Sequence, residues 1–180
     1  MFEINEYIIC GSNGVCRVAD VGTPKMERIN SDRLYYSLEP LYKPGSVIYT
    51  PVDNEKITMR YVLTREATHE LVDAIPDMEA IWVVDDKKRE KEYKTILKQY
   101  DCYEWMKMLK NLYLTKKRRH SEGRKFSNMD EKCLKIVEEC LYGELAISLE
   151  MTREEVGNFL LEKVLGAELD REAEELLDLV

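Results

Sequence analysis

The stretch YIICGSNGVCRVADV, residues 7–21, predicts that the chain begins with a β-hairpin. Its two arms are rich in β-branched residues, and the Asn13–Gly14 pair between them is a strong hairpin signal because both residues tolerate positive φ angles. Four or five short antiparallel strands in the first sixty or so residues favour a small, strongly curved barrel. Three further runs are typical of short strands: RLYYSLEPLY (33–42), VIYTPV (47–52) and KITMRYVL (56–63).

From Thr64 onward, apolar residues recur at the spacing of α-helices. A first short helix ends at Pro76, because proline cannot continue a helix. Residues 76–85 have no clear period, and we interpret them as a linker. The predicted fold class is α+β, in which residues 1–75 form the barrel with its short helix and residues 86–180 form an all-α bundle of four to five helices. The longer helices are predicted at about 86–99, 102–120 and 128–149, with a fourth from about 153.

Three local signals position the last two of these helices. Ser127 has the side chain of an N-cap, and Thr152 with Glu155 forms a capping box. Gly143 lies inside a helix, where glycine costs about 1 kcal/mol relative to alanine. Together with Ala146 one turn later, it predicts a small-residue patch that lets a neighbouring helix come close. We favour this packing role over a direct functional contact.

Charge is strongly segregated along the chain. The 27 basic and 35 acidic residues give a net charge of −8, which argues against indiscriminate binding to nucleic acid or to anionic membranes. Residues 1–86 carry a net charge of −7, residues 87–125 of +9 and residues 126–180 of −10. The basic centre indicates a surface that faces an anion. An equally good interpretation is a solvated helical face that is rich in lysine.

The residue types that perform catalysis or bind metals are sparse. The five cysteines form no CxxC pair, and the two histidines could not complete a zinc site with them. Because the chain has no P-loop, no GxGxxG and no convergent His, Cys and carboxylate group, we expect no enzyme activity, no cofactor and no small-molecule substrate. With no signal peptide and no long apolar run, we expect a reduced, cytoplasmic protein without a membrane partner. The thiols are interpreted as small buried hydrophobic groups.

Five pieces of sequence, in this order, resemble the CarD/CdnL family of bacterial transcription regulators. The resemblance extends over nearly the whole chain. The pieces that carry it are EYIICGSNGVCRVADV, YYSLEPLY, VIYTPVDN, IWVVDDKKREKEYK and LYGELAISL.

The resemblance implies a non-enzymatic transcription factor. In this family a Tudor-like N-terminal domain, shared with the transcription-repair coupling factor, binds the β subunit of RNA polymerase. A helical C-terminal domain contacts promoter DNA beside the upstream edge of the bubble. A tryptophan of that domain inserts at the junction and stabilises the open complex.

By the same resemblance, the polymerase-binding strand is SVIYTPV. Tyr49 falls where other members often have an arginine, so a charge-assisted hydrogen bond is lost here. Backbone pairing along an exposed strand edge does not depend on that side chain. The alternative is that Tyr49 is a half-buried aromatic residue of the strand. The predicted contacts are Ser46, Val47, Ile48, Tyr49, Thr50 and Pro51.

Trp82 is the candidate for the inserted tryptophan, because an apolar ring can occupy the space left when a base step unstacks in the minor groove. In the family this tryptophan lies almost directly before the first long helix, whereas VVDDKKRE intervenes here. Packing between the domains is an equally good interpretation of Trp82. Trp105 has the helical spacing of a core residue.

Basic residues supply the predicted phosphate contacts, which position a protein on DNA without reading its sequence. Because the chain is acidic overall, we expect weak, nonspecific duplex binding that becomes useful once polymerase tethers the protein. An adaptor of RNA polymerase without a DNA role is the alternative function. The predicted DNA-binding set is Trp82, Lys87, Lys88, Arg89, Lys94, Lys116, Lys117, Arg118, Arg119, Arg124, Lys125 and Lys132.

Overall fold

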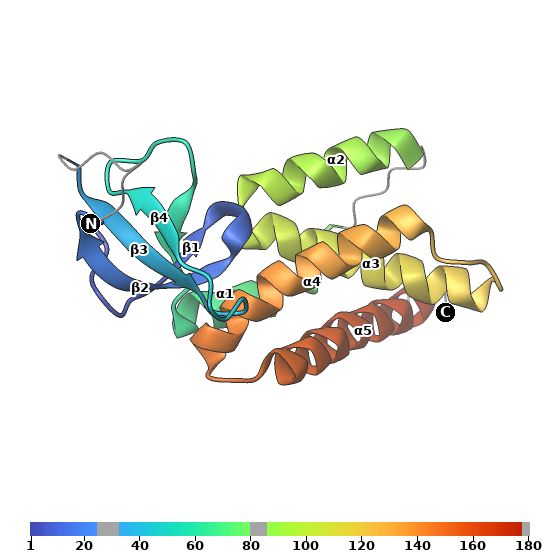
Figure 1. The fold of residues 1–180 in the computed structure, drawn as a ribbon. Coiled ribbons are helices and arrows are strands. Elements are labelled where there is room, and N and C mark those ends of the chain that lie inside the picture. Colours follow the sequence, from blue (N-terminus) through green and yellow to red (C-terminus); the bar gives the residue numbers. More distant parts are fainter. Residues whose placement is uncertain (25–32, 80–85, 178–180) are drawn as a thin grey trace. The chain divides into compact units, whose positions relative to one another are not determined.

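The chain folds into two compact units, residues 1–62 and 63–180. The computed structural model describes residues 1–24, 33–79 and 86–177 (Figure 1). The first unit is a β-sheet and the second is helical, so the α+β class is confirmed. We call them the sheet unit and the helical unit.

The sheet unit contains five strands in its described residues, and all of their pairings are antiparallel. The strand order is β4-β3-β2-β1-β5, which places β4 and β5 at the two ends of the order. The predicted strand runs are therefore confirmed, while closure of the sheet into a barrel stays a prediction. The strands are β1 (Tyr7–Cys10), β2 (Val15–Gly22), β3 (Tyr35–Pro40), β4 (Ile48–Pro51) and β5 (Met59–Tyr61).

The predicted hairpin forms between β1 and β2, but its connection is longer than a two-residue turn. A 3₁₀ turn, Gly11–Asn13, precedes Gly14, which adopts a φ of 70°. The Cys10 amide donates to the Gly14 carbonyl at 3.0 Å and closes the loop. Side chains from one face of the sheet form the core of this unit: Ile8, Cys10, Cys16, Val18, Tyr36 and Leu38.

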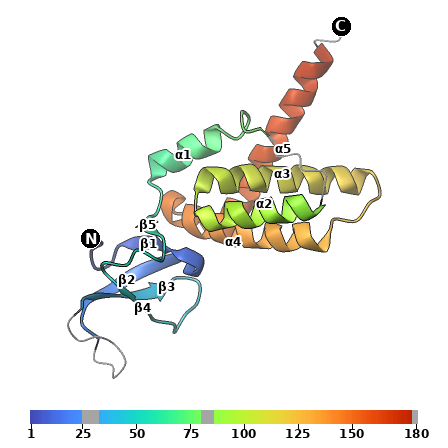
Figure 2. The same ribbon diagram turned by 90° about the horizontal axis from the view of Figure 1, so that it is seen from above.

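The helical unit contains five helices in its described residues (Figure 2). The central helix is α3, which packs against α2, α4 and α5. The predicted caps form: the Ser127 hydroxyl accepts from the Asp130 amide at 3.1 Å, and Thr152 and Glu155 bond each other reciprocally. The helices are α1 (Arg65–Asp73), α2 (Asp86–Gln99), α3 (Cys102–Ser121), α4 (Asn128–Leu149) and α5 (Arg153–Leu177).

Helix α1 groups with the helical unit, whereas the sequence interpretation placed it in the first domain, residues 1–75. Its residues Leu71 and Val72, with Ile75 after its end, are buried in the core of the helical unit. Lys110 of α3 fixes the turn that follows α1. Its Nζ donates to the carbonyls of Ile75 at 2.7 Å, Pro76 at 3.0 Å and Met78 at 2.8 Å. The division of the chain therefore falls after Val62, at the end of the sheet.

Candidate functional site

Strand β4 lies at an edge of the sheet and presents a row of backbone groups away from it. Among the described strands it pairs with β3 alone, with Tyr36 opposite Thr50 and Ser37 opposite Tyr49. The Val52 amide donates to the Leu34 carbonyl at 3.0 Å. Because backbone groups alternate in direction along a strand, those of Tyr49 point to the other side, away from β3.

The side chains of the predicted contact strand differ in exposure. Tyr49 is 38% exposed and Val47 is 49% exposed, whereas Thr50 is buried. Ser46 is exposed in the turn before β4, and Ile48 and Pro51 are half-buried. Since Pro51 has no amide hydrogen, Tyr49 is the one residue of β4 that can donate a hydrogen bond from its outward edge.

A small cleft adjoins the start of β4. It has a volume of about 280 Å³ and is lined by Tyr7, Leu41 and the turn 44–47. Arg17 and Glu39 also line it, and Arg17 donates to Glu39 at 2.6 Å across strands β2 and β3. Leu41 and Val47 are exposed in its lining, and Val47 directly precedes β4. The cleft therefore presents apolar groups next to the edge strand.

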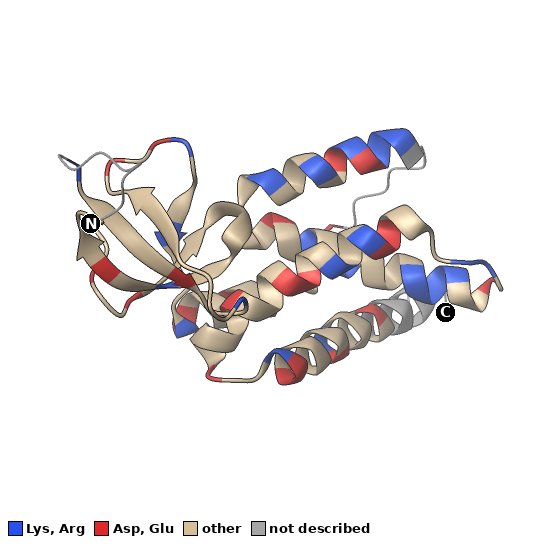
Figure 3. Cartoon of the chain, in the orientation of Figure 1, with Lys and Arg blue, Asp and Glu red and all other residues tan. Residues whose placement is uncertain are grey.

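The structure brings most of the predicted DNA-binding cations together at one end of the helical unit (Figure 3). The start of α2, the end of α3 and the start of α4 all lie at this end (Figures 1 and 2). Figure 3 shows Lys and Arg gathered there on α2, on α3 and in the loop between α3 and α4. We call this surface the basic end, and it comprises Lys87, Lys88, Lys116, Lys117, Arg118, Arg119, Arg124, Lys125 and Lys132.

Arg89 does not belong to the basic end, although it was predicted to contact phosphate. Its guanidinium is buried and donates to both oxygens of Asp130, at 3.1 and 3.2 Å. Asp130 is fully buried and also accepts from the Ser127 hydroxyl at 2.7 Å. The ion pair joins α2 to α4, so Arg89 holds the basic end together from inside.

Other predicted phosphate contacts already have partners. Lys94 lies two turns into α2 and donates to Glu90 at 2.6 Å, which raises the pKa of Lys94 and lowers that of Glu90. Arg119 donates to the Lys125 carbonyl at 3.2 Å, and the Lys116 ammonium lies 5.9 Å from the centre of the Phe126 ring. These contacts organise the loop after α3. The surface is positive but includes exposed carboxylates.

The structure describes one of the two tryptophans, Trp105. Trp82, the predicted inserted residue, and its neighbour Ile81 lie outside the described residues. Trp105 is a core residue, as predicted, with 2% of its surface exposed. Its indole N–H donates to the Ile96 carbonyl at 3.2 Å.

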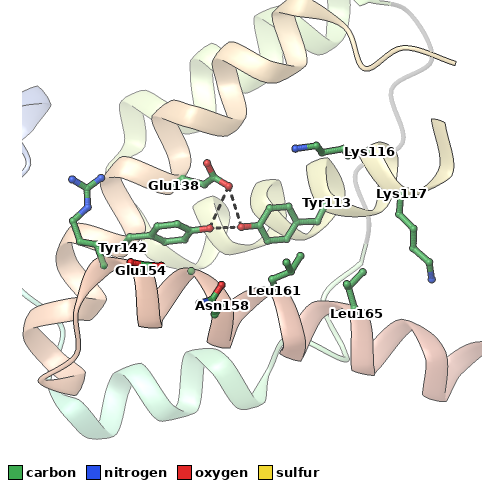
Figure 4. A pocket seen from close by; sticks show the side chains of 11 residues that line it. Tyr113, Lys116, Lys117, Glu138, Tyr142, Glu154, Asn158, Leu161 and Leu165 are labelled. Atoms are coloured by element: carbon green, nitrogen blue, oxygen red, sulfur yellow. Dashed lines mark hydrogen bonds between the residues drawn. The ribbon is translucent and has the colours of Figure 1, made fainter. Parts of the chain in front are cut away.

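Sequence reasoning missed a groove between α3, α4 and α5 (Figure 4). The groove has a volume of about 680 Å³. The hydroxyls of Tyr113 and Tyr142 lie within hydrogen-bonding distance of each other and of Glu138, at 3.1 Å for Tyr113 and 3.3 Å for Tyr142. Because each hydroxyl carries one proton, two of these three contacts are hydrogen bonds at any time. Burial raises the pKa of Tyr142 to about 12 and also raises that of Tyr113. Tyr113 and Tyr142 are distant in sequence, and their spacing within each helix gave no signal.

No helix in residues 1–24, 33–79 and 86–177 has the length and apolar character needed to cross a membrane. The same residues contain no cluster of three His, Cys, Asp or Glu side chains that could hold a metal ion.

Comparison with known proteins identifies the sheet unit. Residues 2–63 match the family described as the CarD-like/TRCF RID domain, and this match covers about a third of the chain. The matched residues coincide with the sheet unit, residues 1–62. A search of curated proteins finds no match to the chain. The sheet unit is thus a CarD-like/TRCF RID domain.

Proposed function

We propose that this protein is a transcription regulator that docks on the β subunit of RNA polymerase through its sheet unit. The family match carries the proposal, because RID domains interact with that subunit. The free edge of β4 supports it, since an exposed edge pairs with a strand of a partner through backbone hydrogen bonds. The exposed side chains of Val47 and Tyr49 add apolar contact beside that edge.

The helical unit then contacts promoter DNA through its basic end and stabilises the open complex. Three helix termini bring their cations to one surface, which suits the phosphate backbone of a duplex. We assign insertion at the bubble edge to Trp82. The affinity for free duplex is weak, because the chain is acidic overall and Arg124 of this surface is already paired with Glu122. Docking on polymerase compensates by raising the effective concentration of DNA.

Two variants of Tyr49 test the docking mode. Tyr49→Pro removes the outward amide and spares the hydrogen bonds between β4 and β3, whereas Tyr49→Ala removes only the side chain. We expect Tyr49→Pro to raise the dissociation constant for a fragment of the β subunit at least tenfold. The increase caused by Tyr49→Ala should be several times smaller than that caused by Tyr49→Pro. The measurement is calorimetric titration of the full chain. Equal, wild-type affinity for both variants contradicts docking through β4.

The second candidate is an adaptor that binds polymerase and makes no DNA contact. The burial of Arg89 and the pairing of Lys94 favour it, because both remove cations that the sequence assigned to phosphate. In that case removal of charge from the basic end leaves the lifetime of the open complex unchanged. Binding to the β subunit stays intact under either candidate, so it does not distinguish them.

A further inference from the structure

Two side chains of α4 hold both backbone groups of Leu63, the first residue of the helical unit. The Leu63 amide donates to Glu144 Oε1 at 2.9 Å. The Ser148 hydroxyl donates to the Leu63 carbonyl at 2.7 Å. Since Glu144 and Ser148 are four residues apart, they lie one above the other on the same face of α4. We call this arrangement the Leu63 clamp.

The chemistry of Glu144 indicates that the clamp is more than packing. The side chain is fully buried, and its second oxygen accepts from the Cys102 thiol at 3.1 Å. Burial of a carboxylate is costly unless hydrogen bonds compensate it, so an apolar residue would fill this space with less penalty. What the carboxylate provides is a fixed acceptor for one particular amide of the chain.

The clamp lies very close to the polymerase-binding unit along the chain. Strand β5 ends at Tyr61, and the clamp holds Leu63, so Val62 is the single residue between them. One residue spans at most about 3.6 Å. Connections between elements usually have about 4–6 residues. Whatever the arrangement of the two units, this connection has almost no slack.

We infer that Glu144 and Ser148 are positioning residues. By fixing Leu63, they keep the basic end within reach of DNA once the sheet unit has docked. The inference rests on the proposed function. A weak DNA-binding surface benefits from a tether only while the tether is short, because effective concentration falls steeply as slack is added. The clamp removes the slack that residues 63 and 64, which precede α1, would otherwise supply.

Four variants of the full chain test the clamp. Glu144→Met with Ser148→Ala removes its acceptor and its donor, and Glu144→Gln keeps the acceptor for the Leu63 amide. A short glycine insertion between Val62 and Leu63 adds slack while it leaves the clamp and the helical core intact. Glu139→Met is the matched control, because Glu139 lies exposed on the same helix.

The first measurement is independent of transcription. NMR relaxation reports how far the two units tumble independently. We expect more independent tumbling in the clamp double variant and in the insertion variant than in the wild type, Glu144→Gln and Glu139→Met. Wild-type tumbling of the double variant would overturn the role of the clamp at the joint.

The second measurement is the half-life of the open complex, with every variant saturating the β subunit. We expect the double variant and the insertion variant to shorten the half-life about fivefold or more, with β-subunit affinity unchanged. A wild-type half-life for the insertion variant overturns the inference. If the wild type itself does not lengthen the half-life, the proposed function fails instead, and the relaxation measurement still decides whether the clamp restrains the joint.

Discussion

The two units use their charged groups in opposite ways. In the sheet unit, the ion pairs Arg17–Glu39 and Arg33–Asp53 lie on the surface over a small apolar core. In the helical unit, Arg89, Lys110 and Glu144 are buried and bonded to particular partners far away in the sequence. Surface pairs contribute little to stability, whereas buried groups enforce which segments meet. Among the described strands, β4 of the sheet unit pairs on one side only, whereas buried charged groups fix the geometry of the helical unit.

Removal of Asp130 is the change with the largest expected effect on this contrast. Asp130→Ala leaves the Arg89 guanidinium buried without its carboxylate, and we expect it to lower the free energy of unfolding of the helical unit by about 3–5 kcal/mol. Urea unfolding followed by tryptophan fluorescence measures this, since both tryptophans lie outside residues 1–62.

The matched control is Asp53→Ala, which breaks the exposed pair with Arg33 in the sheet unit. We expect this variant to leave the stability of the sheet unit, followed by circular dichroism, close to that of the wild type. If Asp53→Ala and Asp130→Ala lower the free energy of unfolding of their units equally, the contrast between the units is lost. Replacement of Arg89 and Asp130 together by Met and Leu should recover most of the stability lost in Asp130→Ala.

Lys110→Met is the next largest change. It deprives three carbonyls of a charged donor, and we expect a loss of about 2 kcal/mol in the free energy of unfolding. Hydrogen exchange should accelerate at the amides of Ile75 and Met78, which lie in the turn that Lys110 holds. Unchanged exchange there, with the same loss of stability, would mean that Lys110 acts elsewhere in the core.

Two matched pairs of lysines test the basic end. Lys87 and Lys98 lie at opposite ends of α2, and Lys116 and Lys107 lie towards opposite ends of α3. We expect Lys87→Ala with Lys116→Ala to reduce the slope of log affinity for duplex DNA against log salt by about 2, because each lost phosphate contact accounts for about 1. Lys98→Ala with Lys107→Ala should leave the slope close to the wild-type value. Equal slopes for the two double variants would place the DNA contact elsewhere.

The smallest expected effect is on the free energy of unfolding at alkaline pH. Burial raises the pKa of Tyr93 and of Tyr142 to about 12, from 10.0. The folded state therefore holds these protons more tightly than the unfolded state, and the stability that they confer is lost as pH rises from about 10 to about 12. Tyr142→Phe should flatten this decline in the free energy of unfolding of the helical unit. A decline as steep as in the wild type would show that Tyr142 makes no contribution.

Local features of the fold followed from the sequence, and long-range ones did not. The caps at Ser127 and Thr152 were predicted because each depends on residues three positions apart. The burial of Arg89 depends on a partner 41 residues away, and the role of Glu144 on an amide 81 residues away. A lysine-rich helix start gives no sign of which of its cations faces inward. The spacing of α1 likewise predicted an apolar side but not the core that it joins.

The central proposal is that the sheet unit docks on polymerase while the helical unit contacts DNA. Its most direct test is the half-life of the open complex on a promoter, with each variant saturating the β subunit of polymerase. We expect the wild type and Lys98→Ala with Lys107→Ala to lengthen the half-life equally, and Lys87→Ala with Lys116→Ala to lengthen it less. If all three proteins give the same half-life, the helical unit does not act through DNA at its basic end.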